Sequence, residues 1–118
     1  MKIILQATNF NLDDAISDFV HKKIGDLDKI LGSANDDSIE ARVEVGRTSD
    51  HHRKGDVYRA EVNLKMPGRL LRAESENFDL YVAVTEVRDE LQRQIRKYKE
   101  KTRDESRRDS IKDNEFPF

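Results

Sequence analysis

The stretch from Asp79 to Arg103 constrains the fold most, because it has the period of a half-buried helix and also reverses its charge along its length. Its apolar side chains recur on one helical face, at Leu80, Val84, Val87, Leu91, Ile95 and Tyr98. Such a face is buried against other elements, so we expect the rest of the chain to supply a surface for it. The opposite face is left free to carry charge.

Charge on this predicted helix changes sign near its middle. Five acids and one base lie between Glu76 and Glu90, whereas six bases and one acid lie between Arg93 and Arg103. The helix macrodipole favours this order, at about 0.3–1 kcal/mol per well-placed charge, so a purely structural role is one interpretation. Six bases in so short a stretch exceed what the dipole needs, and a solvated basic helix can also bind phosphate groups.

Length and composition restrict the class of protein. The chain has 118 residues, which fits one domain, and 39% of them are charged. No apolar run approaches the roughly 18 residues that span a bilayer, and the first ten residues lack the long apolar region and cleavage site of a secretory signal. We therefore expect a cytoplasmic protein without a membrane partner. Cysteine is absent, which excludes disulfides, zinc-thiolate sites and thiol nucleophiles.

Periodicity along the chain predicts the order of elements. Ile3–Thr8 is expected to be a strand, followed by an amphipathic helix that Asn11 caps and that Gly32 stops after Leu31. Apolar and polar residues then alternate from Ile39 to Val45 and from Tyr58 to Met66, and Pro67-Gly68 makes a tight turn into a strand over 69–74. Asn77 or Ser75 is expected to cap the charge-reversed helix.

This order, β-α-β-β-β-α, predicts an α/β (α+β) fold. In this fold we expect two helices to pack on one face of a four-stranded mixed sheet and the other face to be exposed to water. The expected water-facing side chains comprise equal numbers of bases and acids: Arg42, Arg59, Lys65 and Arg72, with Glu40, Glu44, Glu61 and Glu74. Equal numbers favour cross-strand ion pairs over a phosphate-binding platform, and that face lacks the aromatic side chains of sheet-based RNA binders.

Two parts of the chain differ in composition. Residues 104–118 carry three bases and five acids, which accounts for the whole net charge of -2 and leaves residues 1–103 neutral. The segment has no apolar period, so we expect a binding domain over 1–103 and a charged, disordered tail over 104–118.

The sequence offers little for catalysis or metal binding. His51 and His52 stand beside Asp50 in a loop, but no further ligand has a suitable spacing, so we expect a basic loop tip rather than a metal site. No nucleophile elbow, P-loop or dinucleotide fingerprint occurs. We therefore expect no enzyme activity, no metal and no cofactor.

The two predicted helices can share one basic surface if they lie side by side. On the first helix, Lys23 falls within the apolar arc, where its stem either follows the rim of the core or is kept for a function. The expected surface consists of Lys22, Lys23 and Lys29 beside Arg88, Arg93, Arg96 and Lys97, with Lys101 further along.

Several segments resemble the bacterial ribosome hibernation promoting factors and ribosome-associated translation inhibitors. They are Asn9–Leu12 and Val20–Ile24 around the first helix, and Glu76–Val84 and Leu91–Lys97 in the second. The resemblance covers about residues 2–101 and is specific in combination. No residues remain for the second, ribosome-pairing domain of long members, so the short form is expected.

The resemblance implies a protein without catalysis that occupies the messenger and transfer-RNA channel of the small ribosomal subunit through 16S ribosomal RNA. It also implies a cytoplasmic monomer off the ribosome, with no DNA partner. By position it assigns phosphate contacts to Lys22 or Lys23, Arg88, Arg93, Lys97 and Lys101. A different hypothesis remains open, in which the basic helix of a protein-interaction module binds an acidic protein. Whether the chain promotes or blocks ribosome pairing does not follow from these residues.

Overall fold

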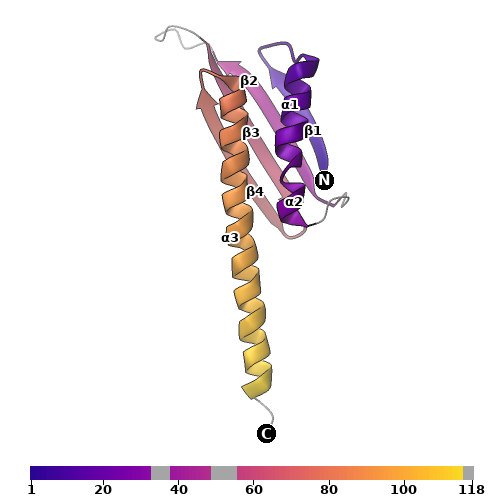
Figure 1. Cartoon of the computed structure of the whole chain (residues 1–118), viewed down its shortest axis with the longest axis vertical. Helices are drawn as coiled ribbons and strands as arrows, with labels where there is room; N and C mark the ends of the chain where they lie inside the picture. Colours follow the sequence, from indigo (N-terminus) through magenta and orange to yellow (C-terminus); the bar gives the residue numbers. More distant parts are fainter. Residues whose placement is uncertain (33–37, 49–55, 116–118) are drawn as a thin grey trace.

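The computed structural model describes residues 1–32, 38–48 and 56–115, with side chains described as far as residue 103. The elements in chain order are β1 Lys2–Thr8, α1 Asp14–Gly25, α2 Asp28–Leu31, β2 Glu40–Thr48, β3 Val57–Met66, β4 Arg69–Asn77 and α3 Leu80–Glu115. Figure 1 shows α3 running along the sheet and then continuing beyond it.

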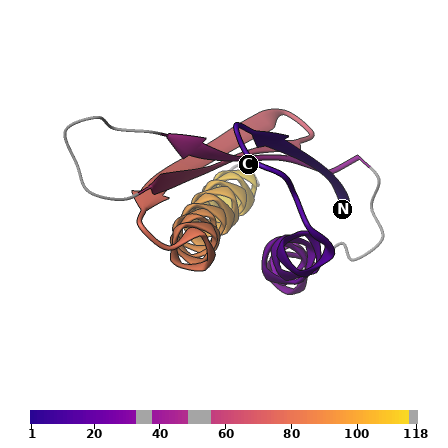
Figure 2. The same cartoon turned by 90° about the horizontal axis from the view of Figure 1, so that it is seen from above.

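The four strands form one mixed sheet in the order β1-β2-β3-β4. The outer strand β1 is parallel to β2, whereas β2, β3 and β4 are antiparallel neighbours. Both long helices lie on the same face of this sheet, as Figure 2 shows from above. The predicted α+β fold with helices on one face is therefore confirmed.

Alternation along the strands builds the core. Val62 in β3 pairs with Val43 on one side and with Ala73 on the other, and all three side chains are buried. Neighbouring residues of the same strands point to the opposite, polar face. Above this apolar row α3 buries most of its predicted face, with Leu80, Val84, Val87, Leu91 and Ile95 each at most 6% exposed. Burial of this apolar surface holds α3 on the sheet.

The first helix differs from the prediction at both ends. Its cap is Asp13 rather than Asn11, since Asp13 Oδ1 accepts the N–H of Ile16 at 2.8 Å. The helix also stops at Gly25, and α2 starts after a tighter turn in which Leu27 N–H donates to Ile24 O. A Cβ on Gly25 would meet nothing within 4 Å, so close packing does not explain that glycine. Gly32 ends α2 as predicted, with φ 71°.

The start and the end of α3 also differ from expectation. Asp79 caps it, because its Oδ1 accepts the N–H of Tyr81, while Asn77 Oδ1 accepts the N–H of Asp79 one step earlier. The helix passes Arg103, its predicted end, and continues to Glu115, whereas the composition of residues 104–118 predicts a disordered segment. The chain contains no glycine or proline between Leu80 and Glu115, so no residue of this stretch breaks a helix. The division of the chain at Arg103 into a binding domain and a separable tail stays a prediction.

Candidate nucleic-acid interface

The candidate interface is the outward side of the helical layer. The helices α1 and α3 lie side by side on the sheet (Figures 1 and 2), so both turn one side to solvent. All eight bases predicted from the sequence belong to this layer: Lys22, Lys23, Lys29, Arg88, Arg93, Arg96, Lys97 and Lys101. Their surroundings divide them into three groups.

Two bases of α3 are held by neighbouring carboxylates. Arg88 is 22% exposed, and its guanidinium lies 3.8 Å from Asp26 and 2.8 Å from Asp89. Arg93 is 64% exposed and makes two contacts with Glu90, at 2.6 and 3.0 Å. The Arg93 hydrogen bonds, together with one from Gln94, lower the pKa of Glu90 to about 2. Both arginines therefore have a carboxylate that would compete with phosphate, and their role in binding stays a prediction.

The bases of α1 and α2 lie at the C-terminal ends of their helices. Lys22 and Lys29 are exposed, in the last turns of α1 and α2, where the helix dipole favours positive charge. Lys23 is half-buried, and its Nζ lies 5.7 Å from the ring centroid of Phe19. Its stem thus follows the apolar rim and ends over an aromatic face.

Three bases of the predicted set remain available in the middle of α3. Arg96, Lys97 and Lys101 are exposed, and none of them forms an ion pair within the part of the chain that the structure describes. Tyr98 and Lys99, which lie between Lys97 and Lys101, contact Arg69 of β4 and Ile30 of α2, and α3 then continues beyond the sheet (Figure 1). An unpaired, solvated cation binds phosphate without first giving up a protein partner. These three side chains are therefore the strongest candidates of the predicted set.

Two further bases, absent from the sequence-based set, lie at the same place. Lys99 Nζ donates to the backbone carbonyl of Ile30, which ties α3 to the end of α2. Arg69, the first residue of β4, lies with its guanidinium carbon 5.3 Å from the ring centroid of Tyr98. The turn at Pro67-Gly68 and the six-base run of α3 were both visible in the sequence, but only the packing of β4 against α3 brings Arg69 to Tyr98.

The outer face of the sheet differs from the helical layer, as expected. Arg59 forms ion pairs with Glu61 and Glu74, and Arg72 forms ion pairs with the same two carboxylates. Glu61 and Glu74 are directly opposite each other on β3 and β4, so the two arginines separate like charges that would otherwise repel. The prediction of cross-strand ion pairs is confirmed, and this network leaves that face mostly self-neutralised.

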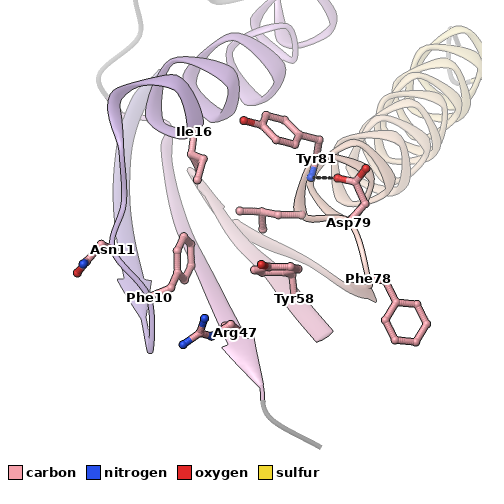
Figure 3. Close-up of a pocket in the computed structure, with 9 residues that line it drawn as sticks. Phe10, Asn11, Ile16, Arg47, Tyr58, Phe78, Asp79 and Tyr81 are labelled. Atoms are coloured by element: carbon pink, nitrogen blue, oxygen red, sulfur yellow. Dashed lines mark hydrogen bonds between the residues drawn. The ribbon is translucent and has the colours of Figure 1, made fainter. Parts of the chain in front are cut away.

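An aromatic pocket lies at the opposite end of the molecule, where α1 and α3 begin. Phe10 and Tyr58 meet edge to face there, with ring centroids 6.2 Å apart, and Ile16 and Tyr81 also line the pocket (Figure 3). Among the described residues that line it, Arg47 is the basic one, and its guanidinium lies 3.7 Å from the Asp56 carboxylate. None of the predicted phosphate contacts lines this pocket.

Among the described residues, no group of three or more His, Cys, Asp or Glu side chains is placed to hold a metal ion. His51 and His52 lie outside the described residues. Across the described ranges, no helix is both long and apolar enough to cross a bilayer.

A mixed four-stranded sheet with two helices on one face and a run of basic side chains in the middle of α3 defines the class of small α+β protein to which this chain belongs. Residues 3–103 match the family model described as "Sigma 54 modulation protein / S30EA ribosomal protein". The chain belongs to this family, and the resemblance stated from the sequence is thereby confirmed.

Characterised relatives are longer. The chain is 30% identical over 95 residues to a ribosome hibernation promotion factor of Deinococcus radiodurans, covering 80% of this chain and 47% of the relative. It is 28% identical over 103 residues to the factor of the same name from Staphylococcus aureus, covering 87% of this chain and 50% of that one. The chain thus spans about half the length of these relatives.

Solved structures agree with the fold. The N-terminal domain of Protein Y from Thermus thermophilus superposes with a TM-score of 0.64 at 32% identity, covering 83% of this chain and 99% of that domain. A ribosomal subunit interface protein from Coxiella burnetii has a TM-score of 0.61 at 21% identity, covering 84% and 98% respectively. The second likeness supports the fold alone.

Proposed function

We propose that this chain is a ribosome-binding stress factor without catalytic activity. It binds 16S ribosomal RNA in the messenger and transfer-RNA channel of the small subunit, inhibits translation by occupying that channel, and promotes ribosome hibernation. It acts in the cytoplasm and is a monomer off the ribosome. The family membership and the names of the relatives support the ribosome as its partner.

The observation that carries the proposal is the group of basic side chains where α3 leaves the sheet, which form no ion pair with any side chain that the structure describes. Arg96, Lys97 and Lys101 project from a helix whose other face is fixed by Leu91 and Ile95, both fully buried. Rigid presentation reduces the entropy lost on binding. Each phosphate that these bases neutralise releases counterions, so the affinity should fall steeply with salt.

Cosedimentation with purified small subunits tests the proposal. The wild-type chain should pellet with subunits at physiological salt and should be displaced by, or displace, messenger RNA and initiator transfer RNA. Undiminished binding of the transfer RNA and this chain to one subunit would contradict occupation of the channel. Absence from the subunit pellet, together with tight binding to an acidic protein, would favour the protein-interaction module instead.

A further inference from the structure

A groove lies between the start of β4 and the middle of α3. Four bases line it: Arg69 from β4, and Arg93, Lys97 and Lys101 from α3. Among the described lining residues none is acidic. The groove on the other side of α3 contains Asp26 beside Lys29 and Arg88, so the β4 side is the more uniformly cationic of the two.

The placement of Arg69 is specific. Its guanidinium carbon lies 5.3 Å from the ring centroid of Tyr98, and Tyr98 is itself half-buried against the sheet. The ring therefore supports one side of the guanidinium. Within the described residues Arg69 forms no ion pair, so its donors are not already taken by a carboxylate.

Lys97 and Lys101 stand one turn apart on the same side of α3, about 6 Å along the helix axis. This separation suits successive phosphates of an extended strand. Arg69 faces the same groove from the edge strand β4. The groove thus offers the ammonium groups of Lys97 and Lys101 to an RNA backbone and the planar guanidinium of Arg69 to a nucleobase. Guanidinium planes stack on nucleobases that are not base-paired.

We propose that this groove binds a single-stranded segment of RNA. Lys97 and Lys101 contact its phosphates, and Arg69 stacks against a nucleobase that is not base-paired. The inference rests on the proposed function, and it adds a strand-binding site on the β4 side of α3, including a residue outside the helical layer. Arg69 is a binding residue here because it touches the RNA directly.

The test compares Arg69→Gln, Arg69→Lys and the matched control Arg42→Gln in binding to purified small subunits over a range of salt concentrations. Arg42 is an exposed arginine on the other face of the sheet. Arg69→Gln should weaken binding about tenfold through loss of stacking, and its log–log salt slope should stay near the wild-type value, because Arg69 is assigned to a nucleobase and not to a phosphate. Arg69→Lys should keep the slope and still lose about fivefold in affinity. Arg42→Gln should bind like wild type.

If both Arg69 variants bind like wild type, the assignment of an RNA strand to this groove is wrong, while the proposed function stays intact. Wild-type binding by Arg69→Lys alone would overturn the stacking of Arg69. Failure of the wild-type chain itself to bind subunits would overturn the proposed function and this inference together. A second arm measures the wild-type chain against a short oligouridylate and an RNA duplex of equal length. Tighter binding of the oligouridylate supports the proposal, and tighter binding of the duplex overturns it.

Discussion

The guanidinium of Arg88 on α3 lies 3.8 Å from the carboxylate of Asp26, which follows the last residue of α1. The same guanidinium lies 2.8 Å from Asp89 on its own helix. Arg88 thus links the two helices whose outer faces form the candidate interface. We infer that it chiefly fixes the spacing of α1 and α3.

Loss of this link should cost stability more than affinity. Arg88→Gln is expected to lower the free energy of unfolding by about 0.5–1 kcal/mol, a small value because Arg88 is 22% and Asp26 38% exposed. A double-mutant cycle with Asp26→Asn in urea denaturation should show coupling between the two positions. Arg42→Gln, at a surface pair with Glu40, serves as the control. A greater loss of subunit binding by Arg88→Gln than by Lys97→Gln would contradict this assignment.

Two leucines test where the core lies. Leu91 on α3 is fully buried and Leu70 on β4 is 62% exposed. Leu91→Ala should therefore lower the free energy of unfolding by about 2–5 kcal/mol through lost burial and a new cavity, whereas Leu70→Ala should change it by about 0.5 kcal/mol or less. Equal effects of the two substitutions in urea denaturation would show that α3 is not held on the sheet through this face.

Periodicity was sufficient to predict the fold because each strand alternates and α3 has one apolar face. Those patterns fixed which side chains of β2, β3 and α3 are buried. Local geometry was harder: both Asn11 and Asp13 are good caps, and only the structure distinguishes them. The helix break after Gly25 arises from a tightened turn, in which Leu27 N–H donates to Ile24 O. The apolar periodicity of the sequence continues across this turn and so does not indicate the break.

The sequence alone could not show which basic side chains of the site form ion pairs, because some of these pairs join different helices. The Arg93–Glu90 pair is three residues apart on one helix and could have been anticipated. The Arg88–Asp26 pair could not, because it depends on how α1 lies against α3. The role of Arg69 could not be predicted for a similar reason, since its place beside Tyr98 depends on the packing of α3 over β4.

The Glu90 carboxyl should report the Arg93 pair directly. Its pKa is lowered from 4.5 to about 2, first by hydrogen bonds from Arg93 and then by one from Gln94. A lowered pKa stabilises the fold above about pH 4.5, and this contribution is lost as the pH falls from 4.5 to about 2. The effect on stability is small because Glu90 is 41% exposed.

Carbon NMR of the Glu90 carboxyl measures that shift. Arg93→Gln should raise its pKa part of the way to 4.5, because Gln94 still donates. Arg96→Gln, which removes a neighbouring charge without touching Glu90, is the matched control. An unchanged Glu90 pKa in Arg93→Gln would mean that the pair does not form in solution.

The basic run over residues 93–103 of α3 should control the salt dependence of subunit binding. Replacing Arg93, Lys97 and Lys101 by glutamine should leave the fold intact, since all three side chains are exposed. If each contacts phosphate, the log–log slope of affinity against salt should fall by roughly 0.7–0.9 per base removed. Filter binding to purified small subunits at several salt concentrations gives the slope.

A control with the same change of charge separates contact from net charge. Lys2, Arg42 and Lys65 are exposed bases on the outer face of the sheet, and their joint replacement by glutamine removes three charges as well. This variant should keep the wild-type slope. Equal slopes for the two triple variants, with native circular dichroism, would mean that the bases of α3 serve its dipole rather than phosphate binding.

The segment after Arg103 should be separable from the binding domain. Near the point where α3 leaves the sheet, Tyr98 contacts Arg69 and Lys99 donates a hydrogen bond to Ile30. A chain ending at Arg103 should therefore unfold within about 0.5 kcal/mol of the full chain in urea denaturation.

Removal of residues 104–118 also makes the net charge of the chain less negative, which favours binding to RNA. Residues 104–118 carry five acids and three bases, so the shortened chain loses a net charge of -2 that repels phosphate. It should bind small subunits at least as tightly as the full chain, most clearly at low salt, where charges are least screened. Loss of subunit binding by the shortened chain, with its helices intact by circular dichroism, would show that the main contact surface lies beyond Arg103 rather than where α3 leaves the sheet.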